Sequence, residues 1–330
     1  MNKLLTLLIA LSIINPIIGQ KRDITLEDLY QRYTFYPSIV NNFKSMNDGE
    51  HYSRMDRDKN IQKINKYQFK DGRKIRTLFN SKNFEIPKIN SYTFSEDEKQ
   101  LLIATETEKI YRYSKKSIYY IYNLQTEKIK KINTQKIMHA TFSPQGDKLA
   151  YVLDNNLFIQ NLSTQAITQV TFDGKSNHII NGAADWVYEE EFKLIKAFEW
   201  SADGENIAYY KFDETNVKKF SMDLFKGNLY PTQQAFKYPK AGEQNSVVKI
   251  YLYNIKKNKN NFIYTEKDYE YFPRLKWTKN PNKLVIFGMN RHQNQLDFIL
   301  VNVNDGSNKV LFTEKDKYYI DIHDNLTFLP

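Results

Sequence analysis

The 330-residue chain has no cysteine and contains only 11 glycines and 9 prolines. The absence of cysteine excludes disulfides, catalysis by a thiol and zinc sites built on thiolates. The scarcity of glycine and proline excludes a collagen-like or low-complexity chain. The five histidines are scattered and form no His-x-x-x-His or His-Glu pair, so we predict no metal and no cofactor. They are His51, His139, His178, His292 and His323.

Acidic residues are also in the minority: the chain has 48 Lys and Arg but only 38 Asp and Glu, which gives a formal charge of +10. A basic balance can indicate a nucleic-acid partner. Here the basic residues are spread along the chain, as in the mixed run 256–260, and no recognised nucleic-acid motif accompanies them. We therefore interpret the lysines as solvated strand edges and turns, where lysine discourages edge-to-edge pairing, and predict no nucleic-acid partner.

Residues 1–19 are typical of a signal peptide. Lys3 supplies the positive start, residues 4–14 form the apolar stretch, and residues 16–19 break it with a small residue at the end. We expect cleavage after Gly19 and export to the periplasm or the extracellular space. The apolar stretch is short for a spanning helix, which needs about 20 residues. The alternative is an uncleaved anchor over residues 4–18, the one case in which we expect a membrane association.

Residues 20–46 are expected to form a helical lead-in. Within it, residues 23–30 predict a short helix with Thr25 as the N-cap and Asp28 three residues further on.

Aromatic residues make up 15% of the chain, mostly Tyr and Phe, which favours strands. From about Asn47 onwards one unit recurs: an apolar strand ending in an aromatic, a polar turn, and a second apolar strand. Its four instances are residues 92–103, 140–151, 198–209 and 275–286. The first two aromatics, Phe94 and Phe142, have a spacing typical of a four-stranded propeller blade of about 40–50 residues. Four such units in order favour a β-propeller over a sandwich.

The later spacings are longer and imply insertions at about residues 173–196 and 213–245. The first insertion carries an unusual run, Asp185-Trp186-Val187-Tyr188-Glu189-Glu190-Glu191. Adjacent carboxylates repel one another unless a cation lies between them. An ammonium suits this position because it offers three donors and forms charge-assisted hydrogen bonds. Composition alone favours a solvated acidic turn, whereas Trp186 and Tyr188 argue against it because aromatic rings tend to be buried.

The run 181–191 resembles the double-glutamate motif of the dipeptidyl peptidase IV family. In that family the motif lies on a short helical segment of a β-propeller, and its second and third glutamates hold the free N-terminal ammonium of the peptide substrate. The resemblance assigns this substrate-binding role to Glu190 and Glu191. It gives Glu189 no direct role towards the substrate.

Two further segments resemble the same family. The run 108–114, followed by the Tyr-rich residues 118–124, implies that Arg112 contacts a backbone carbonyl of the substrate and orients the glutamate pair; guanidinium suits this because it is a fixed fork of donors. The alternative is an ordinary surface ion pair. The run 238–245 closes a segment that forms a dimerisation arm in the family, so residues 217–238 imply a possible homodimer. The alternative is a long surface loop.

The serine-hydrolase part of that family is missing. No Gly-x-Ser-x-Gly elbow occurs, and residues 174–178 come nearest but lack the second glycine. The strand–helix alternation of an α/β-hydrolase is also absent. We therefore predict no catalytic residue in this chain. The resemblance covers residues 47–330, about four to five of the family's eight blades, and we expect a fragment or a truncated gene product.

The sequence thus predicts an all-β protein, an incomplete β-propeller of four-stranded blades with a short N-terminal helix. The resemblance implies the substrate-recognition part of an exported serine peptidase that removes N-terminal X-Pro or X-Ala dipeptides from peptides with a free N-terminus. Two alternatives stay open: a non-catalytic propeller that binds peptides or a partner protein, and a tripeptidyl relative.

Overall fold

The computed structural model describes residues 23–37, 43–265 and 267–329. The predicted signal peptide, residues 1–19, lies outside the described residues. The chain divides into two units, residues 1–43 and 44–330, which are described separately below. No helix within the described ranges is long and apolar enough to cross a membrane.

The described residues of the N-terminal unit, 23–37 and 43, contain one helix, α2 (Leu26–Tyr30). Thr25 caps it, because its Oγ1 accepts a hydrogen bond from Asp28 N at 3.2 Å. The Asp28 carboxylate in turn accepts from Thr25 N at 3.3 Å, which completes a capping box. The predicted helix is therefore confirmed, although it starts at Leu26 rather than at Asp23 because the capping residue itself has an extended backbone.

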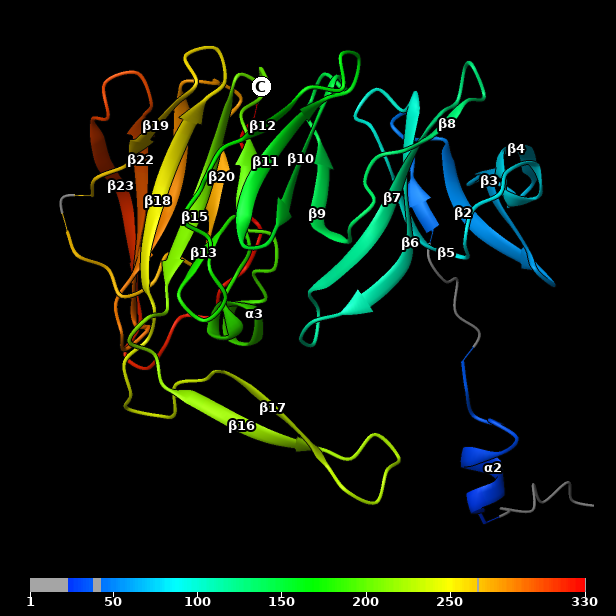
Figure 1. The fold of residues 1–330 in the computed structure, drawn as a ribbon, viewed down its shortest axis with the longest axis horizontal. Coiled ribbons are helices and arrows are strands. Elements are labelled where there is room, and N and C mark those ends of the chain that lie inside the picture. The colour runs from blue at the N-terminus through cyan, green and yellow to red at the C-terminus, as the bar shows by residue number, and fades with distance from the viewer. Residues whose placement is uncertain (1–22, 38–42, 266, 330) are drawn as a thin grey trace, which may run out of the picture. The chain divides into compact units, whose positions relative to one another are not determined.

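The second unit is all-β, and its described residues form five antiparallel blades (Figure 1). The first is a four-stranded meander that lacks the aromatic–serine turn seen in the later blades. This explains why the repeat pattern does not mark it. Its strands are β1 (Phe43–Ser45), β2 (His51–Asp58), β3 (Ile61–Gln68) and β4 (Lys74–Asn80), followed by the short helix η1 (Ser81–Asn83).

The second and third blades are joined into one eight-stranded sheet. The junction is narrow, because β7 pairs with β9 at only two residues, Lys116 with Met138 and Ser117 with Ile137. The second blade consists of β5 (Ile89–Phe94), β6 (Gln100–Lys109), β7 (Lys115–Asn123) and β8 (Ile129–Lys131). The third consists of β9 (Ile137–Phe142), β10 (Lys148–Leu153), β11 (Asn156–Asn161) and β12 (Ile167–Gln169).

The fourth and fifth blades complete the described fold. The fourth contains β14 (Phe198–Trp200), β15 (Asn206–Asp213), β18 (Val247–Asn254) and β19 (Lys259–Phe262), with the short β13 (Ile179–Asn181) paired to β15. The fifth contains β20 (Leu275–Trp277), β21 (Lys283–Met289), β22 (Gln295–Asn302) and β23 (Asn308–Lys315). Each predicted repeat forms the first two strands of a blade, so the predicted all-β propeller is confirmed.

The serine that follows the aromatic residue in the repeat stabilises the turn. Ser95 Oγ donates to Asp97 Oδ1 at 2.7 Å and accepts from Gln100 N at 3.0 Å, which ties the turn to the next strand. Ser201 makes the same pair of bonds, to Asp203 Oδ1 at 2.5 Å and from Asn206 N at 2.9 Å. The side chain thereby satisfies a backbone donor that the turn would leave unpaired.

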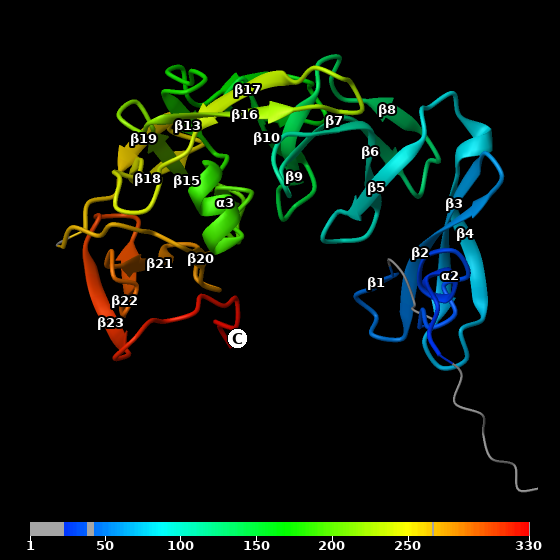
Figure 2. The same cartoon turned by 90° about the horizontal axis from the view of Figure 1, so that it is seen from below.

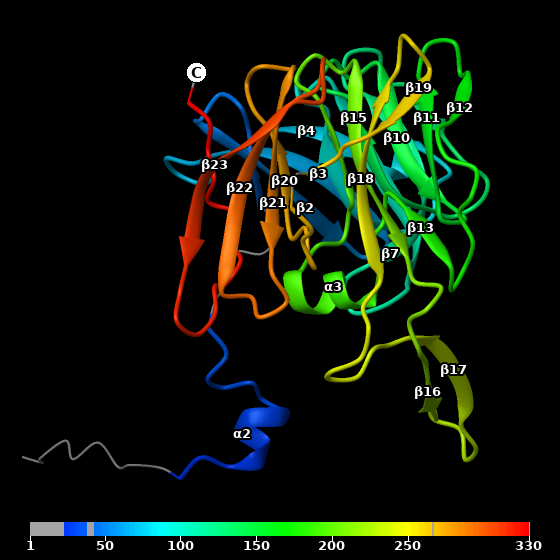
Figure 3. The same cartoon turned by 90° about the vertical axis from the view of Figure 1, so that its left-hand side faces the viewer.

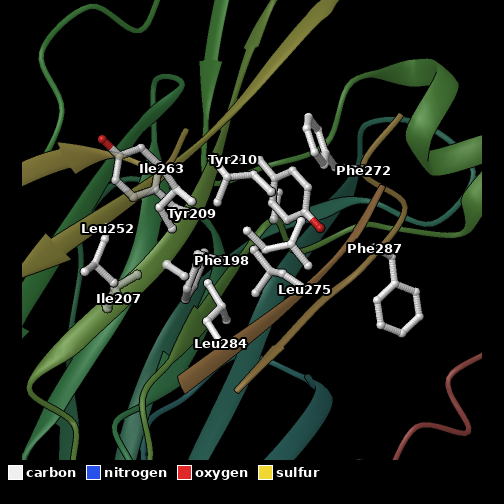
Figure 4. Close-up of a cluster of buried hydrophobic side chains, with 14 of the residues drawn as sticks. Phe198, Ile207, Tyr209, Tyr210, Leu252, Ile263, Phe272, Leu275, Leu284 and Phe287 are labelled. Atoms are coloured by element: carbon white, nitrogen blue, oxygen red, sulfur yellow. The ribbon is translucent and has the colours of Figure 1, made fainter. Parts of the chain in front are cut away.

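The largest core cluster extends over the third, fourth and fifth blades. Phe198, Ile207 and Leu284 are fully buried within it (Figure 4). A hydrogen bond from Trp277 Nε1 to the Glu199 carbonyl, 3.0 Å long, links the fifth blade to the fourth. Burial of these apolar side chains is the main favourable contribution to the stability of the unit.

Two segments depart from the blade pattern. Residues 173–196 contain β13 and the helix α3 (Trp186–Phe192), which lies on the inner side of the arc formed by the blades (Figure 2). Residues 213–245 contain β16 (Lys219–Leu224) and β17 (Thr232–Lys237), which pair only with each other and project from the fourth blade as a two-stranded arm (Figure 3).

Candidate substrate-binding site

Helix α3 begins at a buried cap. Asp185 Oδ1 accepts from Tyr188 N at 2.9 Å, and Asp185 Oδ2 accepts from Ser246 Oγ at 2.5 Å. Burial raises the pKa of Asp185, and the bonds from Ser246 and Tyr188 oppose this shift. The helix ends at Lys193, whose backbone adopts the left-handed conformation with φ 55°. Both ends of this short helix are therefore fixed by specific contacts rather than by helix propensity.

Tyr188 anchors the helix to the core. Its ring lies 5.2 Å from that of Phe192, one turn further on, and 4.9 Å from that of Phe212. Its hydroxyl accepts a hydrogen bond from Phe272 N at 2.8 Å. Burial raises the pKa of Tyr188 well above its ordinary value, so the hydroxyl stays protonated. With Tyr188 and Phe192 turned inward, Glu190 and Glu191 lie on the more accessible side of the helix.

Glu189 is fully buried and holds the loop between β6 and β7. Its Oε1 accepts from Tyr113 N at 2.6 Å and from Ser114 N at 3.0 Å. A carboxylate that accepts two backbone N–H groups is a strong, charge-assisted anchor. The family resemblance assigns Glu189 no direct role towards the substrate, and this positional role was not predicted. No sequence signal could have found it, because its partners are backbone groups about 75 residues away.

The loop that Glu189 anchors carries Arg112. Arg112 Nε lies 2.9 Å from Glu190 Oε2 and 3.2 Å from Glu190 Oε1. This hydrogen bond to Glu190 raises the pKa of Arg112. The Arg112 side chain is 65% exposed and that of Glu190 only 17%. The structure therefore brings together two of the three predicted substrate-binding residues, with the guanidinium open to solvent.

Glu191, the third predicted residue, is exposed and lines a cavity of about 640 Å³. Trp186 and Tyr238 form an aromatic part of the cavity wall, with ring centroids 4.1 Å apart. Residues 238–243 line it as well, so the segment that closes the arm shares this cavity with Glu191. Arg291, also in the wall, donates to Glu270 Oε1 at 2.7 Å.

Metal chemistry has no candidate centre in the part of the chain that the structure describes. No group of three or more His, Asp or Glu side chains is placed there so that it could hold an ion. The carboxylates of α3 instead face a guanidinium, backbone N–H groups and an open cavity. Such an arrangement suits an organic cation that approaches from solvent.

Five blades of antiparallel strands, with a glutamate-bearing helix inserted before the fourth, define a β-propeller with an acidic helix on it. The chain belongs to the dipeptidyl peptidase IV family: residues 95–330 match the family described as the dipeptidyl peptidase IV (DPP IV) N-terminal region.

The relatives agree with this assignment. The chain is similar to the crystal structure of Porphyromonas gingivalis dipeptidyl peptidase 4, with a TM-score of 0.84 and 34% identity over 91% of this chain and 43% of that one. It is 32% identical to human prolyl endopeptidase FAP, covering 70% of this chain and 30% of that protein. It is 31% identical to mouse inactive dipeptidyl peptidase 10, covering 66% and 28%. The chain thus spans less than a third of the length of the two last-mentioned relatives, FAP and dipeptidyl peptidase 10.

Proposed function

We propose that this chain is the substrate-recognition propeller of an exported serine dipeptidyl peptidase that removes N-terminal X-Pro or X-Ala dipeptides. In this proposal Glu190 and Glu191 hold the free N-terminal ammonium of the peptide. The observation that carries it is the Arg112–Glu190 ion pair beside the cavity that Glu191 lines. An ammonium between the two carboxylates would form charge-assisted hydrogen bonds, which are about twice as strong as neutral ones.

Arg112 supports the proposal through its remaining donors. Only its Nε takes part in a hydrogen bond within the described residues, so both terminal nitrogens of the fork can still donate. A peptide carbonyl one residue after the bound ammonium is the natural acceptor for such a donor. Clamping the terminus in this way positions the scissile bond for a serine nucleophile, which this chain does not supply.

A second candidate function is a propeller that binds peptides without cleaving them. It is favoured by the similarity to a relative whose name describes it as inactive dipeptidyl peptidase 10. Ammonium recognition by α3 is common to both candidates. Only the presence of a nucleophile elsewhere in the protein separates them.

Export and self-association complete the proposal. Residues 1–19 would direct the chain out of the cytoplasm. The arm over residues 217–238 would contribute to a homodimer, and its exposed tip residues Leu229 and Tyr230, 84% and 80% accessible, would be covered there. Analytical ultracentrifugation of the Leu229→Asp/Tyr230→Asp variant tests this: a dimer that becomes a monomer supports the arm, and an unchanged dimer contradicts it.

Hydrolysis of a Gly-Pro chromogenic amide tests the enzymatic half of the proposal. The 330-residue chain would be compared with a version extended through the reading frame that follows Pro330. Activity in the extended version alone supports a recognition propeller of a peptidase. An extended version that contains an intact hydrolase elbow and still leaves the amide uncleaved contradicts it and favours the binding propeller.

A further inference from the structure

A second hollow begins where helix α3 ends. It has a volume of about 460 Å³ and lies between the fourth and fifth blades. Its polar lining includes Lys193, Lys196, Glu199, Tyr210, Arg274 and Lys276, and His323, Asp324 and Leu326 complete this side of the wall. None of them belongs to the set that contacts Glu190 or lines the cavity beside Glu191.

The charge of this hollow is opposite to that of α3. Two cations are compensated: Lys196 Nζ lies 3.0 Å from Glu199 Oε1, and Arg274 Nε lies 2.5 Å from Asp324 Oδ1. The other two form no salt bridge among the described residues, although the charge of Lys276 also acts on Asp324. Lys276 donates to the Leu326 carbonyl, and Lys193 is exposed at the end of α3. The lining therefore carries an excess of positive charge.

Tyr210 adds an independent observation. Its side chain is only 1% exposed, and its hydroxyl has no hydrogen-bond partner in the part of the chain that the structure describes. Figure 4 shows this hydroxyl pointing away from the β15 backbone towards Phe287, another residue of the hollow's wall. Buried polar groups are nearly always paired, because an unmade hydrogen bond is costly. A donor without an acceptor, facing a hollow of surplus cations, points to an anionic ligand.

We propose that this hollow binds a small oxyanion, a carboxylate or a phosphate group, whose oxygens accept from the Tyr210 hydroxyl and from Lys193 and Lys276. Ammonium groups only donate, and the phenol donates most strongly to a charged acceptor. Burial raises the pKa of Tyr210, so the hydroxyl keeps its proton for this bond. Glu199 and Asp324 are paired with Lys196 and Arg274, so Lys193 and Lys276 supply the surplus positive charge that attracts the ligand.

Titration of the 330-residue chain with inorganic phosphate, and separately with an N-acetylated acidic tripeptide, tests the proposal by calorimetry at constant ionic strength. The acetyl group removes the ammonium, so the tripeptide cannot engage Glu190 and Glu191. Saturable binding of either probe supports the site. Binding of phosphate alone identifies a free anion as the ligand, and binding of the tripeptide alone identifies a peptide carboxylate. Binding of neither overturns the proposal.

The variants separate a built site from diffuse charge attraction. Tyr210→Phe should weaken the anion about tenfold or more, as expected for a lost hydrogen bond to a charged group, without lowering the melting temperature of the anion-free chain. Lys193→Met/Lys276→Met should weaken it similarly. Lys226→Met, an exposed lysine of the arm, is the matched control and should change nothing. Weakening in the lysine variant with unchanged affinity in Tyr210→Phe would contradict the site.

Discussion

Arg112 and Glu190 are 78 residues apart in the sequence and form an ion pair with 2.9 Å between Nε and Oε2. The pair joins the β6–β7 loop of the second blade to the helix inserted before the fourth. Neither residue alone distinguishes a binding site from an ordinary surface. Their contact joins a guanidinium to one carboxylate, and the next residue of the helix, the exposed Glu191, lines a cavity.

The Arg112–Glu190 pair should matter for binding and not for stability. Arg112 is largely exposed, and exposed ion pairs contribute little to folding because solvent screens them. We expect Arg112→Met to leave the melting temperature unchanged and to weaken the binding of a dipeptide amide about tenfold. Arg112→Lys keeps the charge but loses the fork of donors, so it should bind the dipeptide amide nearly as weakly as Arg112→Met does. Full affinity in Arg112→Lys would show that only charge is needed there.

Glu189 should matter for the stability of the chain as well as for binding. In Glu189→Ala the buried N–H of Ser114 and the partly buried N–H of Tyr113 lose their acceptor, and a buried unpaired donor costs about 1–3 kcal/mol. We expect a loss of about 2–4 kcal/mol in the free energy of unfolding, measured by denaturant titration. Glu189→Gln keeps one acceptor oxygen and should lose less. Equal stability of the alanine variant and the wild type would refute the anchoring role.

Glu214 should make stability depend on pH. Burial raises its pKa to about 7 from 4.5, repulsion from Asp185 adds to the shift, and Lys237 opposes it. Because the folded-state pKa is the higher one, the contribution of Glu214 to stability is fully present below about pH 4.5 and is lost as the pH rises through about 7.

Glu214→Gln removes this titration. We therefore expect the variant to be more stable than the wild type above pH 7. Its melting temperature, measured by thermal unfolding, should also decline less between pH 4.5 and 7. Glu85→Gln, at an exposed carboxyl, is the control and should leave the pH profile as it is. An unchanged decline in Glu214→Gln would assign the pH dependence to another group.

Lys237 should hold the base of the arm. The residue is buried, with 8% of its surface exposed. Its Nζ donates to the Thr215 carbonyl at 2.9 Å and to the Val217 carbonyl at 2.6 Å. Lys237→Met leaves both acceptors unpaired, so we expect faster proteolysis within residues 215–238 and a lower melting temperature. Lys218→Met removes an exposed lysine from the same segment and should have no such effect.

The parts of the fold that the sequence predicts are those with local signals. The blades after the first repeat an aromatic followed by a serine or threonine turn, and in α2 the cap Thr25 and Asp28 stand three residues apart. The first blade lacks that turn and leaves no comparable mark. Glu190, Glu191 and Arg112 came from a motif resemblance, whereas the contact of Glu189 with backbone N–H groups of a distant loop depends on the folded chain alone.

The most direct test of the account is calorimetric titration of the 330-residue chain with Gly-Pro amide and with its N-acetylated form. We expect saturable binding of the free amine and loss of that binding on acetylation. We also expect affinity to fall about tenfold or more in Glu190→Gln and in Glu191→Gln, because each removes one charged acceptor of the ammonium. Equal binding of the acetylated and free peptides, or full affinity in both glutamine variants, would contradict it.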